Sequence, residues 1–84
     1  MIPKKIHYVW FGQKEKNIEV KNCIESWTKY LPDYEIIEWN EKNFDMSTSL
    51  SVKESFHAHI YAFASDFVRL WAVYNYGGIY LDTD

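Results

Sequence analysis

Residues 76–84, YGGIYLDTD, decide how the rest of the chain is interpreted. Two glycines end a helical pattern, a short apolar run follows as a strand, and two carboxylates stand one residue apart where that strand ends. Because side chains alternate along an extended backbone, Asp82 and Asp84 point the same way, ~7 Å apart along the strand. Carboxylate oxygens suit a hard divalent cation that also binds phosphate. Two acids in a surface turn are common, but the position of this pair at the exit of an apolar strand favours a metal site.

Strand-like and helix-like segments alternate before this stretch. Dense runs of β-branched and aromatic residues predict strands over 5–12 and 34–39, in addition to the strand over 79–81. Apolar residues at helical spacing predict one helix over 17–31 and a second, long one over 52–76. In the long helix we expect a stripe of large apolar side chains to face the core: Ile60, Phe63, Phe67, Leu70, Trp71 and Tyr74.

The order βαβαβ predicts an α/β fold with a parallel sheet and right-handed helical crossovers. Nearly continuous apolarity over 5–12 indicates a strand that is buried on both faces. We expect the strand order 2-1-3, in which the chain reverses direction across the sheet between strands 1 and 3. Ligands bind at the carboxyl ends of the strands beside such a switch point, and these ends carry Trp10 and Asp82.

Length and composition predict a single domain over residues 1–84. Aromatic residues make up 19% of the chain, which is a heavy load for so small an interior. These rings either line a binding cleft or are covered by the rest of a larger domain. We favour the second interpretation, in which the chain is the amino-terminal part of a longer protein.

Charge and cysteine content exclude some classes of function. The net charge is −3 and no basic run is present, which argues against nucleic-acid binding. A lone Cys23 cannot form an internal disulfide, and no apolar run approaches the length of a membrane span. We expect a cytoplasmic chain, with membrane-peripheral attachment of the full-length protein as an alternative.

Four other residues are candidates for ligand binding, and each also has a plain structural interpretation. Asp66 and Arg69 lie three residues apart on the long helix, where they form either a surface ion pair or a phosphate- and hydroxyl-binding pair. Trp10, at the end of the first strand, either stacks on a base or fills the core. Tyr80, which neighbours the acids, either contacts a ligand or packs with its hydroxyl bonded.

Three motifs in order resemble a known family. Residues 6–12 (IHYVWFG), residues 64–69 (ASDFVR) and residues 77–84 (GGIYLDTD) are similar to the glycosyltransferase sugar-binding region that contains the DXD motif. That family includes bacterial capsule and lipopolysaccharide glycosyltransferases, fungal outer-chain mannosyltransferases and, more distantly, glucosylating toxins. The resemblance implies the amino-terminal part of a GT-A fold, a UDP- or GDP-hexose donor, a glycan or polysaccharide acceptor, Mn²⁺ or Mg²⁺, and retention of anomeric configuration.

The resemblance also implies roles for individual residues. Trp10 would stack on the nucleotide base, and Asp66 and Arg69 would contact the donor sugar and its phosphates. Tyr80 and Asp82 would line the ribose and the outer shell of the metal, and Asp84 with Asp82 would hold the metal itself. No catalytic residue is assigned.

The resulting hypothesis is the donor-binding part of a metal-dependent glycosyltransferase. Family members continue with acceptor-binding elements that this chain lacks, so we expect the 84-residue piece alone to be inactive. Two alternatives stay open. The chain could be a non-catalytic module that binds a nucleotide or nucleotide sugar, or an interaction domain that self-associates through an exposed sheet edge.

Overall fold

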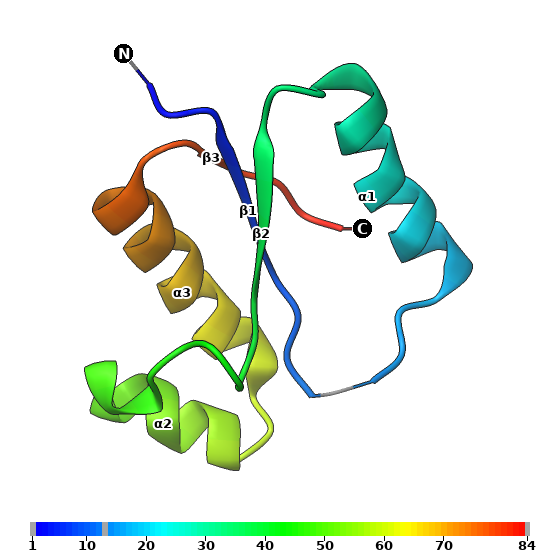
Figure 1. The fold of residues 1–84 in the computed structure, drawn as a ribbon. Coiled ribbons are helices and arrows are strands. Elements are labelled where there is room, and N and C mark those ends of the chain that lie inside the picture. Colours follow the sequence, from blue (N-terminus) through cyan, green and yellow to red (C-terminus); the bar gives the residue numbers. More distant parts are fainter. Residues whose placement is uncertain (1, 13, 84) are drawn as a thin grey trace.

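The computed structural model describes residues 2–12 and 14–83. Helices and strands alternate along the chain as expected, and the sheet has three strands (Figure 1). The strands are β1 (Lys5–Val9), β2 (Glu35–Trp39) and β3 (Ile79–Tyr80). The helices are α1 (Ile18–Tyr30), the 3₁₀ turn η1 (Met46–Thr48), α2 (Leu50–His57) and α3 (Tyr61–Tyr76).

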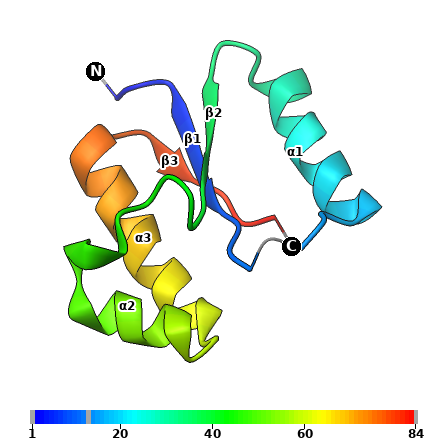
Figure 2. The ribbon, with the colours of Figure 1, turned by 60° about the horizontal axis from the view of Figure 1, so that its bottom comes forward.

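The sheet is parallel with the order β2-β1-β3, which confirms the predicted fold class and strand order. Helix α1 covers one face of the sheet and α3, with α2 beside it, covers the other (Figures 1 and 2). Register aligns Ile6 with Ile79 and His7 with Tyr80. The carboxyl ends of all three strands therefore meet at one edge.

Two apolar clusters hold the layers together, one on each face of β1. On the α1 face, Ile6 and Tyr8 pack with Trp27 of α1. On the α3 face, the buried residues are Val9, Trp39, Phe44, Val52, Ala64, Val68 and Ala72. The alternation along β1 confirms that this strand is buried on both faces, as its continuous apolarity predicts.

His7 joins β1 to its surroundings from a fully buried position. Its Nδ1 accepts a hydrogen bond from the Trp39 indole at 3.0 Å, and its Nε2 lies 2.8 Å from the carbonyl oxygen of Gly77. These partners assign the neutral tautomer with the proton on Nε2, which donates to Gly77. His7 thus ties β1 to β2 through Trp39 and to the end of α3 through Gly77.

The predicted long helix is wrong in two respects. It is divided into α2 and α3 by a turn in which His59 adopts a left-handed backbone with φ of 61°. In addition, the face that packs on the sheet consists of the small residues Ala64, Val68 and Ala72, all fully buried. Small side chains let the helix axis approach the strands closely, so α3 buries this face.

The stripe expected to be buried lies largely in solvent. Tyr74 is 89% exposed and Leu70 68%, and Ile60 and Phe63 are each more than half exposed. Phe67 and Trp71 pack at the margin of the α3-side cluster. The outer face of α3 is therefore apolar and uncovered within the part of the chain that the structure describes. None of the described helices is long and apolar enough to cross a bilayer.

Candidate functional site: two polar groups at the carboxyl edge of the sheet

The double glycine allows β3 to lie against β1. Gly78 has φ of 90°, and a Cβ placed on it would overlap the carbonyl oxygen of Lys5. Gly77 also has a positive φ of 72°, and its Cβ would lie 2.7 Å from Cγ of Pro3. Glycine is needed at both positions because other residues strain this backbone. The close approach brings the exit of β3 next to α3.

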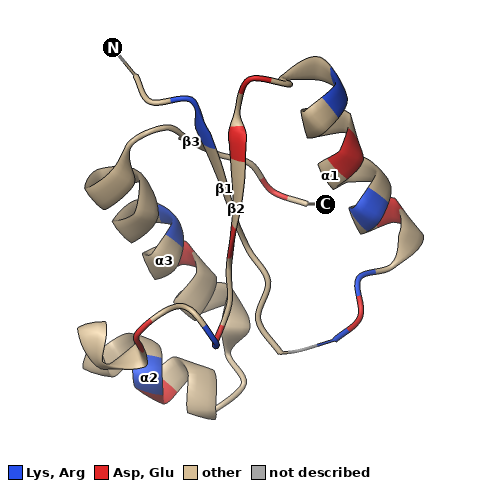
Figure 3. Ribbon diagram, viewed as in Figure 1, with Lys and Arg blue, Asp and Glu red and all other residues tan. Residues whose placement is uncertain are grey.

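Asp66, Arg69, Tyr80 and Asp82 form one cluster, called here the Arg69 cluster. Asp66 and Arg69 are the only charged residues of α3 and lie side by side at its middle (Figure 3). Arg69 Nη2 lies 3.9 Å from Asp66 Oδ1, and its guanidinium carbon lies 5.5 Å from the centre of the Tyr80 ring. The guanidinium is thus held over the phenol that immediately precedes the exit of β3.

The charges of this cluster all act on the pKa of Tyr80. Burial raises the pKa of Tyr80 to about 12, and the negative charge of Asp82 acts in the same direction. Asp66 raises this pKa further, whereas the positive charge of Arg69 opposes the shift. Tyr80 therefore lies within electrostatic reach of Asp66, Arg69 and Asp82.

The geometry alone gives the ion pair little stabilising value. The side chains of Asp66 and Arg69 are 71% and 43% exposed, and such pairs contribute about 0–1 kcal/mol to stability. Stability therefore does not explain why the chain places its only arginine here. The guanidinium fork keeps N–H groups that can bind phosphate or hydroxyl oxygens.

The residues at the exit of β3 fit a divalent cation. Of the two predicted metal ligands, Asp82 is an exposed carboxylate and Asp84 lies outside the described residues. The described residues contain no group of three or more potential metal ligands. Mg²⁺ is usually bound through one or two carboxylates and the phosphates of a substrate, so this chemistry does not require a closed cage of protein ligands among the described residues.

Trp10 is not part of the Arg69 cluster. Side chains alternate along β1, and Trp10 packs against the cluster on the α1 face, whereas Tyr80 packs on the α3 face. Four of the five predicted donor-binding residues therefore lie together, and the fifth, Trp10, lies on the opposite face of the sheet. Both groups lie at the carboxyl edge of the sheet, on the neighbouring strands β1 and β3.

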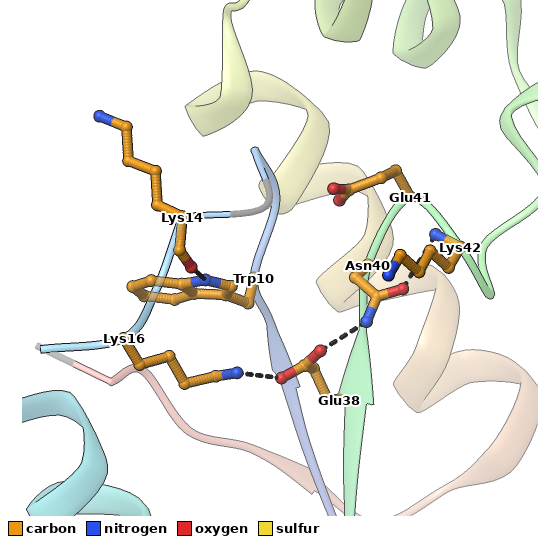
Figure 4. Close-up of a pocket in the computed structure, with 7 residues that line it drawn as sticks. All are labelled: Trp10, Lys14, Lys16, Glu38, Asn40, Glu41 and Lys42. Atoms are coloured by element: carbon orange, nitrogen blue, oxygen red, sulfur yellow. Dashed lines mark hydrogen bonds and ion pairs between the residues drawn. The ribbon is translucent and has the colours of Figure 1, made fainter.

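A polar pocket of about 240 Å³ surrounds Trp10 (Figure 4). It lies where β1 and β2 end, and it is called here the Trp10 pocket. Its lining residues are Trp10, Lys14, Lys16, Glu38, Asn40, Glu41 and Lys42. Sequence reasoning missed all of them except Trp10. The polar run that directly follows β2 could have indicated them, because in a parallel sheet it begins at the same edge as Trp10.

Glu38 organises one wall of this pocket. Its carboxylate lies 2.6 Å from Lys16 Nζ and accepts a hydrogen bond from the Tyr8 hydroxyl at 2.8 Å. Although burial opposes ionisation, hydrogen bonds from Lys16, Tyr8 and Asn40 keep the pKa of Glu38 below its ordinary value. Lys16 is held with its ammonium 5.5 Å from the centre of the Trp10 ring. Trp10 in turn donates its indole N–H to the Lys14 carbonyl at 2.8 Å.

The parallel sheet of order β2-β1-β3 between helical layers is the amino-terminal, Rossmann-like part of a GT-A fold. Residues 17–84 match the family described as the glycosyltransferase sugar-binding region containing the DXD motif. The chain belongs to this family, which confirms the resemblance seen in the sequence.

Two curated relatives are similar to nearly the whole chain. Inositol phosphoceramide mannosyltransferase 3 of Schizosaccharomyces pombe is 35% identical over 92 positions, covering 99% of this chain and 24% of that protein. The subversion of eukaryotic traffic protein A of Legionella pneumophila is 31% identical over 112 positions, covering 99% of this chain and 17% of that protein. The chain spans about a fifth of the length of these relatives. No solved structure matches the chain significantly.

Proposed function

We propose that this glycosyltransferase sugar-binding region binds the donor of a metal-dependent hexosyl transfer. The donor would be a nucleotide-diphosphate hexose, and the acceptor a glycan or polysaccharide. The observation that carries the proposal is the Arg69 cluster, in which a guanidinium and two carboxylates gather at the carboxyl end of β3. The similarity to a mannosyltransferase supports the same class of reaction.

The proposed roles follow from the chemistry of each side chain. Arg69 would donate hydrogen bonds to phosphate oxygens, and Asp66 would accept hydrogen bonds from sugar hydroxyls. Tyr80 and Asp82 would line the ribose side of the site, and Trp10 would stack on the base. A nucleotide sugar that reaches both Trp10 and Arg69 has to lie across the ends of β1 and β3.

Mn²⁺ or Mg²⁺ would be held by Asp84 and Asp82, together with the diphosphate. When bound, the cation would offset the charge that develops on the leaving diphosphate. The acceptor hydroxyl would attack the anomeric carbon as the carbon–oxygen bond to the diphosphate breaks, and we propose that the configuration is retained. Arg69 would hold the phosphates during this step, and Asp66 would fix the orientation of the sugar.

The test is titration of the chain with UDP and with GDP, in the presence and absence of Mn²⁺. Tryptophan fluorescence and the amide signals of residues 82–84 report binding. We expect binding that requires Mn²⁺ and is lost in Asp84→Ala, because that substitution removes the proposed metal ligand. Asp33→Ala is the matched control, since Asp33 lies in an exposed turn before β2.

Two outcomes would contradict this function. If neither UDP nor GDP binds to the folded chain, the chain has no donor site. If the nucleotides bind equally well without Mn²⁺, the proposed role of the metal is wrong. That result would favour a non-catalytic module that binds nucleotides.

A further inference from the structure

The proposed function does not say which base the donor nucleotide carries. The Trp10 pocket contains features that favour one base over the others. At about 240 Å³ the pocket is smaller than a site for a whole drug-sized ligand, but it suits one flat ring system. Figure 4 shows the indole of Trp10 nearly edge-on, with Lys16 on one side of its plane and both Lys14 and the Glu41 carboxylate on the other. Lys16 therefore covers one face of the indole, and Glu41 lies on the side that a stacked ring would occupy.

Glu41 is unusual among the acidic groups of this pocket. Its Oε2 is buried and has no hydrogen-bond partner within the described part of the chain. Glu38, by contrast, is paired with Lys16 and bonded to Tyr8. A buried acceptor without a donor is destabilising, so such atoms require an explanation. A ligand that brings N–H groups to Glu41 would supply the missing donors.

The hydrogen-bonding edge of each base decides which ligand fits. Guanine presents two adjacent donors, its ring N1–H and its exocyclic amine, which match the two oxygens of one carboxylate. Uracil presents a single N–H between two carbonyl oxygens, and these oxygens would face the negative charge of Glu41. Lys14, Lys16 and Lys42 also line the pocket, but the flat face of Trp10 beside the Glu41 carboxylate suits the base rather than the diphosphate.

We propose that Glu41 makes the Trp10 pocket a guanine site, so that the donor is a GDP-hexose. The inference rests on the proposed function, because it assumes that the chain binds a nucleotide-diphosphate sugar. Glu38 acts as a positioning residue, because its ion pair holds Lys16 against one face of Trp10, on the side opposite the Glu41 carboxylate.

The experiment compares the dissociation constants of GDP, IDP and UDP for the chain in Mn²⁺. IDP keeps the ring N–H of GDP but lacks the exocyclic amine. We expect GDP to bind most tightly, IDP roughly 10-fold more weakly, and UDP more weakly still. In Glu41→Gln, GDP should lose about 10- to 100-fold in affinity, whereas UDP should change little.

The control is Glu54→Gln, an exposed acid on α2 outside the pocket, which should leave all three constants unchanged. Thermal unfolding provides a second readout. Because Oε2 of Glu41 has no hydrogen-bond partner among the described residues, Glu41→Gln should keep or raise the unfolding midpoint. A marked drop in this midpoint would show that the carboxylate serves the fold and would overturn the inference.

The remaining outcomes separate the two proposals. If UDP binds as tightly as GDP and both require Mn²⁺, the proposed function is supported but the guanine site is wrong. The guanine site also falls if Glu41→Gln weakens GDP and UDP equally. If no nucleotide binds to the folded chain, both proposals fall together.

Discussion

Arg69 illustrates how a single residue can be placed for binding at little cost to stability. Its ion pair with Asp66 is exposed, and its guanidinium packs over the ring of Tyr80. Both contacts are weak at the surface, about 1 kcal/mol or less each. The planar fork is nevertheless held in one place, which favours recognition of phosphate through two parallel hydrogen bonds.

Arg69→Lys tests this view at the residue scale. Lysine keeps the charge but loses the planar fork, so we expect the affinity for a nucleotide diphosphate in Mn²⁺ to fall about 10-fold. The free energy of unfolding should change by less than about 0.5 kcal/mol. Isothermal titration and urea unfolding measure the two quantities, with Glu19→Asp on the exposed surface of α1 as a conservative control. Unchanged affinity would show that Arg69 does not bind phosphate.

The candidate residues differ in how far the sequence revealed them. Asp66, Arg69, Tyr80 and Asp82 lie in two segments whose motifs predicted one site, and the structure gathers them. Glu41 gave no such signal, because it follows β2 in a polar stretch without periodicity. Its burial depends on the loops around Trp10, which local pattern does not specify.

At the scale of elements, the approach of β3 to β1 depends on two glycines that differ in their surroundings. A Cβ on Gly78 would meet backbone of Lys5, whereas a Cβ on Gly77 would meet side-chain atoms of Pro3. A strand cannot move its carbonyl without breaking the sheet, but a proline ring near the chain terminus can shift.

Gly78→Ala should therefore destabilise the chain more than Gly77→Ala. We expect a loss of roughly 2–4 kcal/mol for Gly78→Ala and about 1–2 kcal/mol for Gly77→Ala, since both also place alanine at positive φ. Urea unfolding followed by tryptophan fluorescence measures both values. Equal losses in the two variants would mean that backbone strain, rather than the contact with Lys5, limits β3.

Helices α2 and α3 show where helical periodicity misleads. Large apolar residues at helical spacing predicted the buried face, but α3 buries Ala64, Val68 and Ala72 instead. The face was wrong because burial is set by how closely a helix can approach the sheet, and small residues permit the closer approach. The break at His59 was also missed, since no proline or glycine marks residues 58–60.

At the scale of the whole molecule, one side of the sheet ends in a short exposed strand. Ile79 of β3 is 37% exposed, and the outer face of α3 is also apolar. Unpaired strand edges next to apolar surface favour pairing with a second chain. We expect the 84-residue chain to self-associate as its concentration rises.

Ile79→Lys tests this expectation, because a charged side chain on an edge strand opposes edge-to-edge pairing. Sedimentation velocity at several concentrations should show association of the original chain and mainly monomer for the variant. Ile2→Lys introduces the same charge at an exposed position outside the strands and should leave association unchanged. A chain that is monomeric at all concentrations would contradict the expectation.

The sequence by itself determined the βαβαβ order, the parallel sheet with β1 at its centre, and the choice of Asp66, Arg69, Tyr80 and Asp82 as neighbouring candidate residues. These features follow from local patterns and motifs, whose period and spacing are written along the chain. Only the tertiary structure decided which side of the sheet each site residue occupies. Trp10 and Tyr80 lie on opposite faces because β1 and β3 pair with His7 beside Tyr80, and this register comes from packing between segments about 70 residues apart.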